Sequence, residues 1–215
     1  MDAEKMRYTA TPFVITLAGV LALEFIAGPA VPVDDPLVAT GVIRALQAAF
    51  IVAAALLFGG DARIAGLRLQ ALARGIKRGL IWSAVFGAIA AIAGIAIMLS
   101  GYEPLGMIRV GLPYDKQAIV ALFLVGGLVG PLAEELFFRG AVYGFFRRSG
   151  VIAAVLGSSA LFILAHSAGG IAPTHVVGAF VFAAAYEYEK NIMVPVTIHV
   201  LGNIALFSLA FLMAS

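Results

Sequence analysis

The sequence predicts an all-α bundle of about seven transmembrane helices, integrated into one domain. The 215-residue chain is 62% hydrophobic and only 12% charged, whereas a soluble domain is about 45–50% apolar and about 25% charged. Its mean hydropathy is +1.05, and its apolar residues form long runs. Because open strands cannot satisfy their backbone hydrogen bonds in lipid, each run is expected to be a helix.

Seven apolar runs approach the roughly 20 residues that a membrane crossing requires. The fourth run contains Pro131, which has no backbone N–H, so we expect a bend there. The fifth and sixth runs are shorter and are interrupted by glycines. The expected spans are residues 10–30, 37–58, 79–100, 117–146, 151–167, 173–188 and 192–214.

Lysine and arginine gather on one face of this topology. The opposite face has only Arg109 and Lys116. Cytoplasmic loops carry the excess of basic residues, so the N-terminus is expected in the cytoplasm and the C-terminus across the membrane. Residues 61–78 are basic and partly amphipathic, which predicts an interfacial helix. The ten residues of the basic face are Lys5, Arg7, Arg63, Arg68, Arg74, Lys77, Arg78, Arg147, Arg148 and Lys190.

Composition also excludes several kinds of function. The chain has no cysteine, which excludes disulfides, thiolate catalysis and Cys-ligated metals. A net charge of +2 is too small to indicate a nucleic-acid partner. The first apolar run is long enough to cross the membrane, so a cleavable signal peptide is not expected.

Ionisable side chains inside spans are costly and mark functional sites by default. The fourth span carries the adjacent pair Glu134 and Glu135, which lie about 100° apart on a helix and cannot face one partner. Glu135 and Arg139 have the i, i+4 spacing of an ion pair. This pairing leaves Glu134 directed toward the interior, where a carboxylate can serve as a general base. The alternative is that both glutamates are structural.

Two later spans carry imidazoles at helical spacing with a second side chain. Phe162 and His166 share one helix face, and so do His199 and Asn203. Two hydrogen-bonding groups aimed at one point could stabilise an oxyanion. Each histidine could instead be a satisfied core residue, and the His199–Asn203 pair could join helices by hydrogen bonds.

Other polar residues receive no catalytic role. His175 follows Pro173 and is expected to cap a helix or lie at the interface, while Glu24 and Arg44 in the first two spans either pair or line a cavity. Ser158 and Ser159 lack the G-x-S-x-G frame of a serine hydrolase.

In these late spans the sequence resembles the CPBP (Abi) family of CAAX proteases and bacteriocin-processing enzymes. That family carries E-E-x-x-x-R, F-x-x-x-H and H-x-x-x-N on successive helices. The resemblance covers roughly residues 117–205. It divides the single domain into residues 1–116, with three N-terminal transmembrane helices and a basic cytoplasmic loop, and residues 117–215, with the catalytic core helices. The matching residues are Glu134, Glu135, Arg139, Phe162, His166, His199 and Asn203.

The resemblance implies a glutamate-dependent intramembrane endopeptidase similar to the Ras-converting CAAX protease. Glu134 and His166 would activate a water for attack on the peptide carbonyl, and His199 and Asn203 would stabilise the oxyanion. Glu135, Arg139 and Phe162 would support the site. Two histidines and a glutamate could ligate zinc, but H-E-x-x-H is missing and Asn203 is a poor zinc ligand, so no cofactor is expected.

The expected substrate is a membrane-anchored protein or peptide that is cut near its C-terminus, and the expected location is the bacterial inner membrane. The alternative function is a non-catalytic membrane transporter or a bacteriocin-immunity factor. A transporter usually shows broken helices in two matching halves, and the sequence shows no such symmetry.

Overall fold

The computed structural model describes residues 10–59, 69–103, 111–113 and 115–214, and its regular elements are all helices. The α-helices are α1 (Ala10–Ala22), α2 (Pro36–Gly59), α3 (Leu72–Leu99), α4 (Lys116–Ala121), α5 (Gly130–Glu135), α6 (Tyr143–Phe146), α7 (Val151–Ala165), α8 (Pro173–Glu189) and α9 (Met193–Ala214). The π-helical segments are Leu23–Ala27, Leu122–Val129 and Leu136–Val142, and the 3-10 turns are Gly28–Ala30, Leu69–Ala71, Arg147–Ser149 and Ser167–Gly169.

These segments join into seven helical rods, as the sequence predicts. Five rods of the described chain are long and apolar enough to cross a bilayer. The other two, α7 and α8, have 15 and 17 residues. The molecule is therefore an all-α polytopic membrane bundle. The five long rods are Ala10–Ala30, Pro36–Phe58, Leu72–Leu99, Lys116–Ser149 and Met193–Met213.

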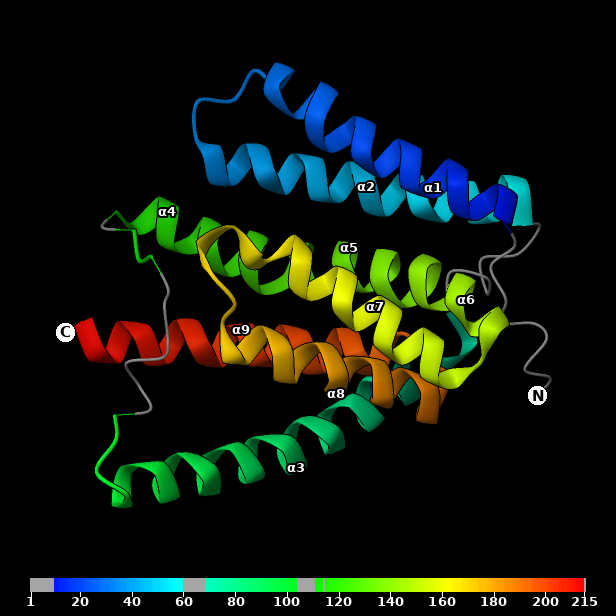
Figure 1. Cartoon of the computed structure of the whole chain (residues 1–215). Coiled ribbons are helices and arrows are strands. Elements are labelled where there is room, and N and C mark those ends of the chain that lie inside the picture. Colours follow the sequence, from blue (N-terminus) through cyan, green and yellow to red (C-terminus); the bar gives the residue numbers. More distant parts are fainter. Residues whose placement is uncertain (1–9, 60–68, 104–110, 114, 215) are drawn as a thin grey trace.

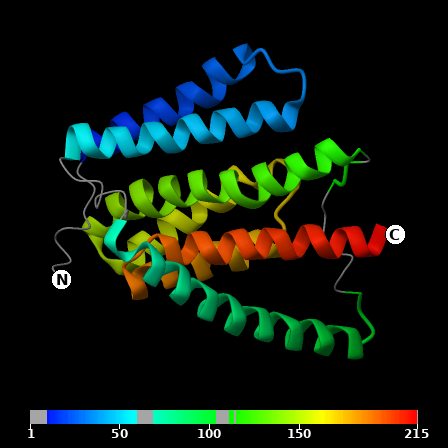
Figure 2. The same ribbon diagram turned by 180° about the vertical axis from the view of Figure 1, so that it is seen from behind.

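The rods are arranged around a central group made of α5, α7, α8 and α9 (Figure 1). The antiparallel pair α1 and α2 covers one side of this group, and α3 lies on the opposite side, as the reverse view also shows (Figure 2). The start of α1 and the end of α9 lie at opposite ends of the bundle, which agrees with an odd number of crossings.

The third rod begins earlier than the sequence predicts. Residues 72–78, expected to belong to an interfacial helix, are the first two turns of α3; residues 61–68 of the predicted stretch fall outside the described part. Gly75 and Gly79 are buried where α3 meets α9. A Cβ on Gly79 would lie 2.5 Å from Cβ of Thr197, so glycine is what allows this close approach.

The fourth rod does not break at Pro131. Backbone angles stay helical at Val129 and Gly130, and the missing bond is absorbed by a π-helical segment directly before the proline. In this register Gly130 N–H donates to Val125 O, five residues back. The next bond of the series would need the N–H that Pro131 lacks, so the carbonyl of Gly126 requires another donor.

Charged pairs close the end of the bundle where the described chain begins. Arg78 of α3 binds Glu189 of α8 at 2.6 Å. Arg147 binds Glu187 at 3.1 Å, and Lys190 also contacts Glu187. Three of the ten basic residues that the sequence assigns to one face, Arg78, Arg147 and Lys190, therefore lie at one end of the structure.

Candidate active site

Glu134 lies between two imidazoles from different helices. Its Oε2 atom is 3.5 Å from Nε2 of His166 and 3.8 Å from Nε2 of His199. The fourth rod, the end of α7 and the middle of α9 supply these three groups. Both distances exceed a direct N–H···O hydrogen bond, so the Glu134 carboxylate faces both imidazoles without a short bond to either.

The Nδ1 atom of each imidazole has a different hydrogen-bond acceptor. His166 Nδ1 donates to the Phe162 carbonyl at 2.8 Å. His199 Nδ1 lies 2.9 Å from Glu135 Oε1. Since a carbonyl and a carboxylate oxygen only accept, both Nδ1 atoms carry a proton, and both Nε2 atoms face Glu134. The local backbone explains the first bond, because His166 ends α7 and its ring folds back over the last turn.

Glu135 connects the site to a fully buried arginine. The same Oε1 atom that contacts His199 accepts a 3.2 Å bond from Arg139 Nη1, and neither Glu135 nor Arg139 is exposed. Arg139 Nη2 donates to the carbonyl of Ala179 in α8 at 3.0 Å. The i, i+4 pair that the sequence predicts is therefore present, and it orients His199 as well as neutralising two buried charges.

Two aromatic rings hold the histidines over this arginine. The guanidinium carbon of Arg139 lies 4.8 Å from the ring centroid of Phe162 and 5.3 Å from that of Phe182. Phe162 in turn stacks on His166, with centroids 4.4 Å apart, and Phe182 stacks on His199 at 4.6 Å. Each imidazole thus rests on a ring that contacts the same cation.

Sequence reasoning missed Phe182. Phe182 belongs to α8, and no charged residue in the membrane portion of α8 marks that helix as functional. The spacing of Phe182 from the motif residues does not reveal a partner on another helix. Only the packing of α8 against α9 shows its role.

Asn203 faces a backbone carbonyl. Its Nδ2 donates to Gly126 O at 2.8 Å, the acceptor that Pro131 leaves without a donor. Within the described residues no hydrogen bond or ion pair joins Asn203 to Glu134, His166 or His199. An amide nitrogen carries two protons, so one N–H remains beyond the bond to Gly126.

His175 lies closer to the site than the sequence suggests. Its ring centroid is 4.8 Å from that of His166, and its Nδ1 atom is buried without a hydrogen-bond partner. Its place in the first turn of α8, after the turn that follows His166, brings the two rings together.

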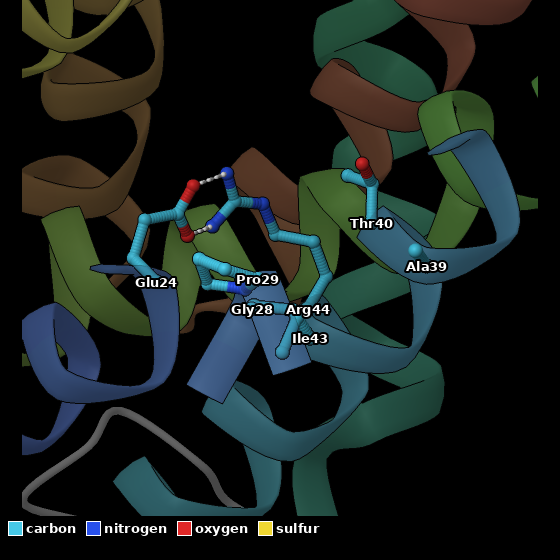
Figure 3. A pocket seen from close by; sticks show the side chains of 7 residues that line it. All are labelled: Glu24, Gly28, Pro29, Ala39, Thr40, Ile43 and Arg44. Carbon is cyan, nitrogen blue, oxygen red and sulfur yellow. Dashed lines mark hydrogen bonds and ion pairs between the residues drawn. The ribbon is translucent and has the colours of Figure 1, made fainter. Parts of the chain in front are cut away.

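The first two rods carry a second polar cluster. Glu24 and Arg44 form a bidentate ion pair, with Nη1–Oε2 and Nη2–Oε1 distances of 2.7 and 3.2 Å (Figure 3). Both residues line a cavity of about 240 Å³. Both alternatives that the sequence left open, pairing and lining a cavity, are therefore observed.

The described residues contain no group of three or more His, Cys, Asp or Glu side chains arranged to hold a metal ion. Ser158 and Ser159 are buried in α7. Ser159 Oγ donates to the Ala179 carbonyl that Arg139 also binds, whereas Ser158 Oγ has no hydrogen-bond partner among the described residues.

Comparison with known proteins singles out the region that carries these groups. Residues 116–205 match the model of the family described as type II CAAX prenyl endopeptidase Rce1-like. No solved structure gives a significant match.

Two curated relatives are bacterial. One is YdiL of Bacillus subtilis (strain 168), by its name a candidate membrane peptidase, which is 31% identical over 88 residues, or 40% of this chain and 36% of that protein. The other is the membrane-embedded CAAX protease MroQ of Staphylococcus aureus (strain USA300), 30% identical over 95 residues, or 41% of this chain and 38% of that protein. The chain thus spans well under half the length of both relatives. Residues 116–205, which carry the glutamates and histidines of the site, are thus similar to CAAX-type membrane proteases.

Proposed function

We propose that this protein is an intramembrane endopeptidase of the glutamic type, which hydrolyses a peptide bond near the C-terminus of a membrane-anchored protein or peptide. The observation that carries this proposal is the position of Glu134 Oε2 between the Nε2 atoms of His166 and His199, at 3.5 and 3.8 Å. The similarity of residues 116–205 to CAAX-type endopeptidases supports peptide hydrolysis as the class of reaction.

Glu134 and His166 activate the water in this proposal. With Nδ1 of His166 donating to Phe162 O, the Nε2 lone pair of the neutral ring and the Glu134 carboxylate are both acceptors. A water between them donates one O–H to each and turns its own lone pair outward. Attack on the carbonyl carbon transfers a water proton to the Glu134–His166 pair, which returns it to the leaving amine when the C–N bond breaks.

His199 and Asn203 stabilise the tetrahedral oxyanion. In its cationic form His199 carries protons on both nitrogens, so Nδ1 donates to Glu135 while Nε2 donates to the oxyanion. Asn203 contributes the N–H that is not bound to Gly126 O. Preorganised donors of this kind contribute most when charge develops in a site that excludes bulk water.

Glu135, Arg139 and Phe162 act as supporting residues. Glu135 fixes the tautomer and orientation of His199, as an outer carboxylate does for a catalytic imidazole. Arg139 balances the charge of Glu135 and, with Phe162, sets the plane of His166. Catalysis in this scheme needs no metal or other cofactor.

Orientation and location follow from the charge distribution. We place the N-terminus in the cytoplasm of a bacterial cell and the protein in its inner (plasma) membrane. Arg78, Arg147 and Lys190 at the N-terminal end of the bundle support this placement, as do relatives from two bacteria.

The test compares the full-length protein with its Glu134→Gln variant. Each is incubated with membranes from a bacterial strain that lacks this protein, and new C-termini are identified by mass spectrometry. We expect cleavage products with the wild type and with Asp115→Asn, because asparagine preserves the N-cap that Asp115 provides to α4. We expect none with Glu134→Gln. Equal cleavage by Glu134→Gln would refute the role of Glu134.

Metal independence is tested in the same assay. Product formation is expected to survive a chelator that strips zinc from proteins. Loss of activity on chelation, with recovery on adding zinc, would show that the two imidazoles and the carboxylate hold a metal instead.

A further inference from the structure

The cavity between α1 and α2 carries an arginine whose hydrogen-bonding capacity is only partly used. Arg44 Nη1 donates to Glu24 Oε2 at 2.7 Å and to Gln47 Oε1 at 2.6 Å, and Nη2 donates to Glu24 Oε1 at 3.2 Å. A guanidinium has five N–H donors. The Nε–H and one Nη2–H therefore have no acceptor among the described residues.

These two remaining donors form one edge of the guanidinium plane. Glu24 takes the end of the plane, between Nη1 and Nη2, and the side edge, between Nε and Nη2, stays open (Figure 3). The side edge presents two parallel N–H groups that match the two oxygens of a carboxylate. The Arg44 side chain is 25% exposed, so a ligand can reach this edge.

The rest of the cluster holds the guanidinium in place. Gln47 is almost fully buried; its Nε2 donates to Glu24 Oε2 at 2.9 Å and to the carbonyl of Val20 at 3.2 Å. Glu24 itself belongs to a π-helical segment, which turns its side chain toward α2. Arg44 is thus preorganised by neighbours that leave its side edge free, which is how a built binding site differs from a simple ion pair.

The open edge belongs to a helix that packs against the rod bearing Glu134. Helix α2 packs along the fourth rod: Gly41 faces Val125, and Ala48 lines one groove together with Leu132. This register places Arg44 level with Leu128, six residues before Glu134, which is roughly 9 Å along the helix axis.

We propose that the side edge of Arg44, in the cavity lined by Glu24 and Thr40, binds the C-terminal carboxylate of the substrate peptide. This assignment rests on the proposed endopeptidase function. The assignment extends that function, because a substrate whose carboxylate is held at Arg44 would present a peptide bond close to its C-terminus to Glu134. The cavity of about 240 Å³ admits a chain end rather than a folded domain. Glu24 keeps the arginine neutral overall when no substrate is present, which lowers the cost of a charge at this depth.

Binding is tested without turnover. The full-length protein in lipid nanodiscs is heated with N-acetyl-leucine, with N-acetyl-leucine amide, or with n-dodecyl phosphate as a probe for lipid phosphate. We expect N-acetyl-leucine to raise the melting temperature and the amide to leave it unchanged. Arg44→Lys keeps the charge that Glu24 needs but lacks the parallel donors, so it should lose the shift. Arg148→Lys, the same change at an exposed arginine, should keep it.

Cleavage provides the second arm. Peptides that the wild type cuts are offered as free acids and as C-terminal amides. For the free acids, Arg44→Lys is expected to raise KM about tenfold, the usual effect of losing a hydrogen bond to a charged group, with kcat unchanged. For the amides, wild type and variant should have the same KM.

Three results would overturn the proposal: equal stabilisation by the acid and the amide, an undiminished shift in Arg44→Lys, or stabilisation by dodecyl phosphate alone, which would assign the edge to a lipid headgroup. If the wild type gives no cleavage products while the carboxylate shift persists, the protease function falls and the carboxylate site stands.

Discussion

Asn203 Nδ2 donates a 2.8 Å hydrogen bond to the carbonyl of Gly126, the acceptor that Pro131 cannot serve in the π-helical register of the fourth rod. The side-chain amide of Asn203 on α9 thus replaces the backbone N–H that Pro131 lacks in the fourth rod. This bond ties α9 to the segment that leads into Glu134.

Replacing Asn203 by Leu should therefore destabilise the protein by about 1–3 kcal/mol, the cost of leaving a buried carbonyl unpaired. Thermal unfolding in detergent measures this loss. In a Pro131→Ala background residue 131 regains its N–H and can serve Gly126, so the same Asn203→Leu change should cost clearly less.

The double variant also separates the two roles of Asn203. If the oxyanion role holds, the Pro131→Ala, Asn203→Leu protein is stable and has a reduced kcat. Full activity in that protein would leave Asn203 with the structural role alone.

Glu135→Gln should be among the most destabilising single changes in the late helices. It leaves the buried Arg139 without its counter-ion, and breaking a buried pair on one side costs about 3–5 kcal/mol. Replacing both partners, Glu135→Leu with Arg139→Met, should recover most of the stability measured by thermal unfolding. Activity should stay lost, since His199 then has no acceptor for Nδ1.

Phe182→Leu tests the aromatic support of His199. Loss of the stacked ring is worth about 0.5–1.5 kcal/mol, so kcat should fall roughly three- to tenfold while the protein stays folded. Phe180→Leu is the matched control, because Phe180 lies two residues away on the same helix with its ring exposed. Equal activity of both variants would contradict the positioning role.

Gly79→Ala tests the α3–α9 contact. The new Cβ would lie 2.5 Å from Thr197 Cβ, and overpacking of this kind costs about 1–3 kcal/mol. Gly87→Ala on the same helix meets nothing within 4 Å and should leave the melting temperature unchanged or slightly higher. A melting temperature for Gly79→Ala equal to that of Gly87→Ala would disprove the close packing.

Sequence patterns predicted the seven helical rods and their order, because each membrane span needs a long apolar run whatever helices surround it. They also gave the Glu135–Arg139 pair, since i, i+4 spacing acts within one helix. The start of α3 was misplaced because its basic first turns pack against α9 through Gly75 and Gly79, and composition alone reads such turns as interfacial.

Contacts between helices were harder to foresee. Two such contacts are the proximity of His175 to His166 and the stacking of Phe182 on His199. Both depend on how the helices are rotated and tilted relative to one another, which residue spacing within one helix does not reveal. One clue was present in the sequence: a proline in a span leaves a carbonyl one turn earlier without a donor, and Asn203 was a polar residue available to supply it.

The short hairpin of α7 and α8 affects the surrounding lipid. At a rise of about 1.5 Å per residue, the 15 residues of α7 cover roughly 22 Å, less than the roughly 30 Å of a typical hydrocarbon core, while the 28 residues of α3 exceed it. From these lengths we expect acyl chains to compress beside the hairpin and not beside α3. We therefore expect headgroup water to come nearest to the reaction centre at His166, at the tip of α7.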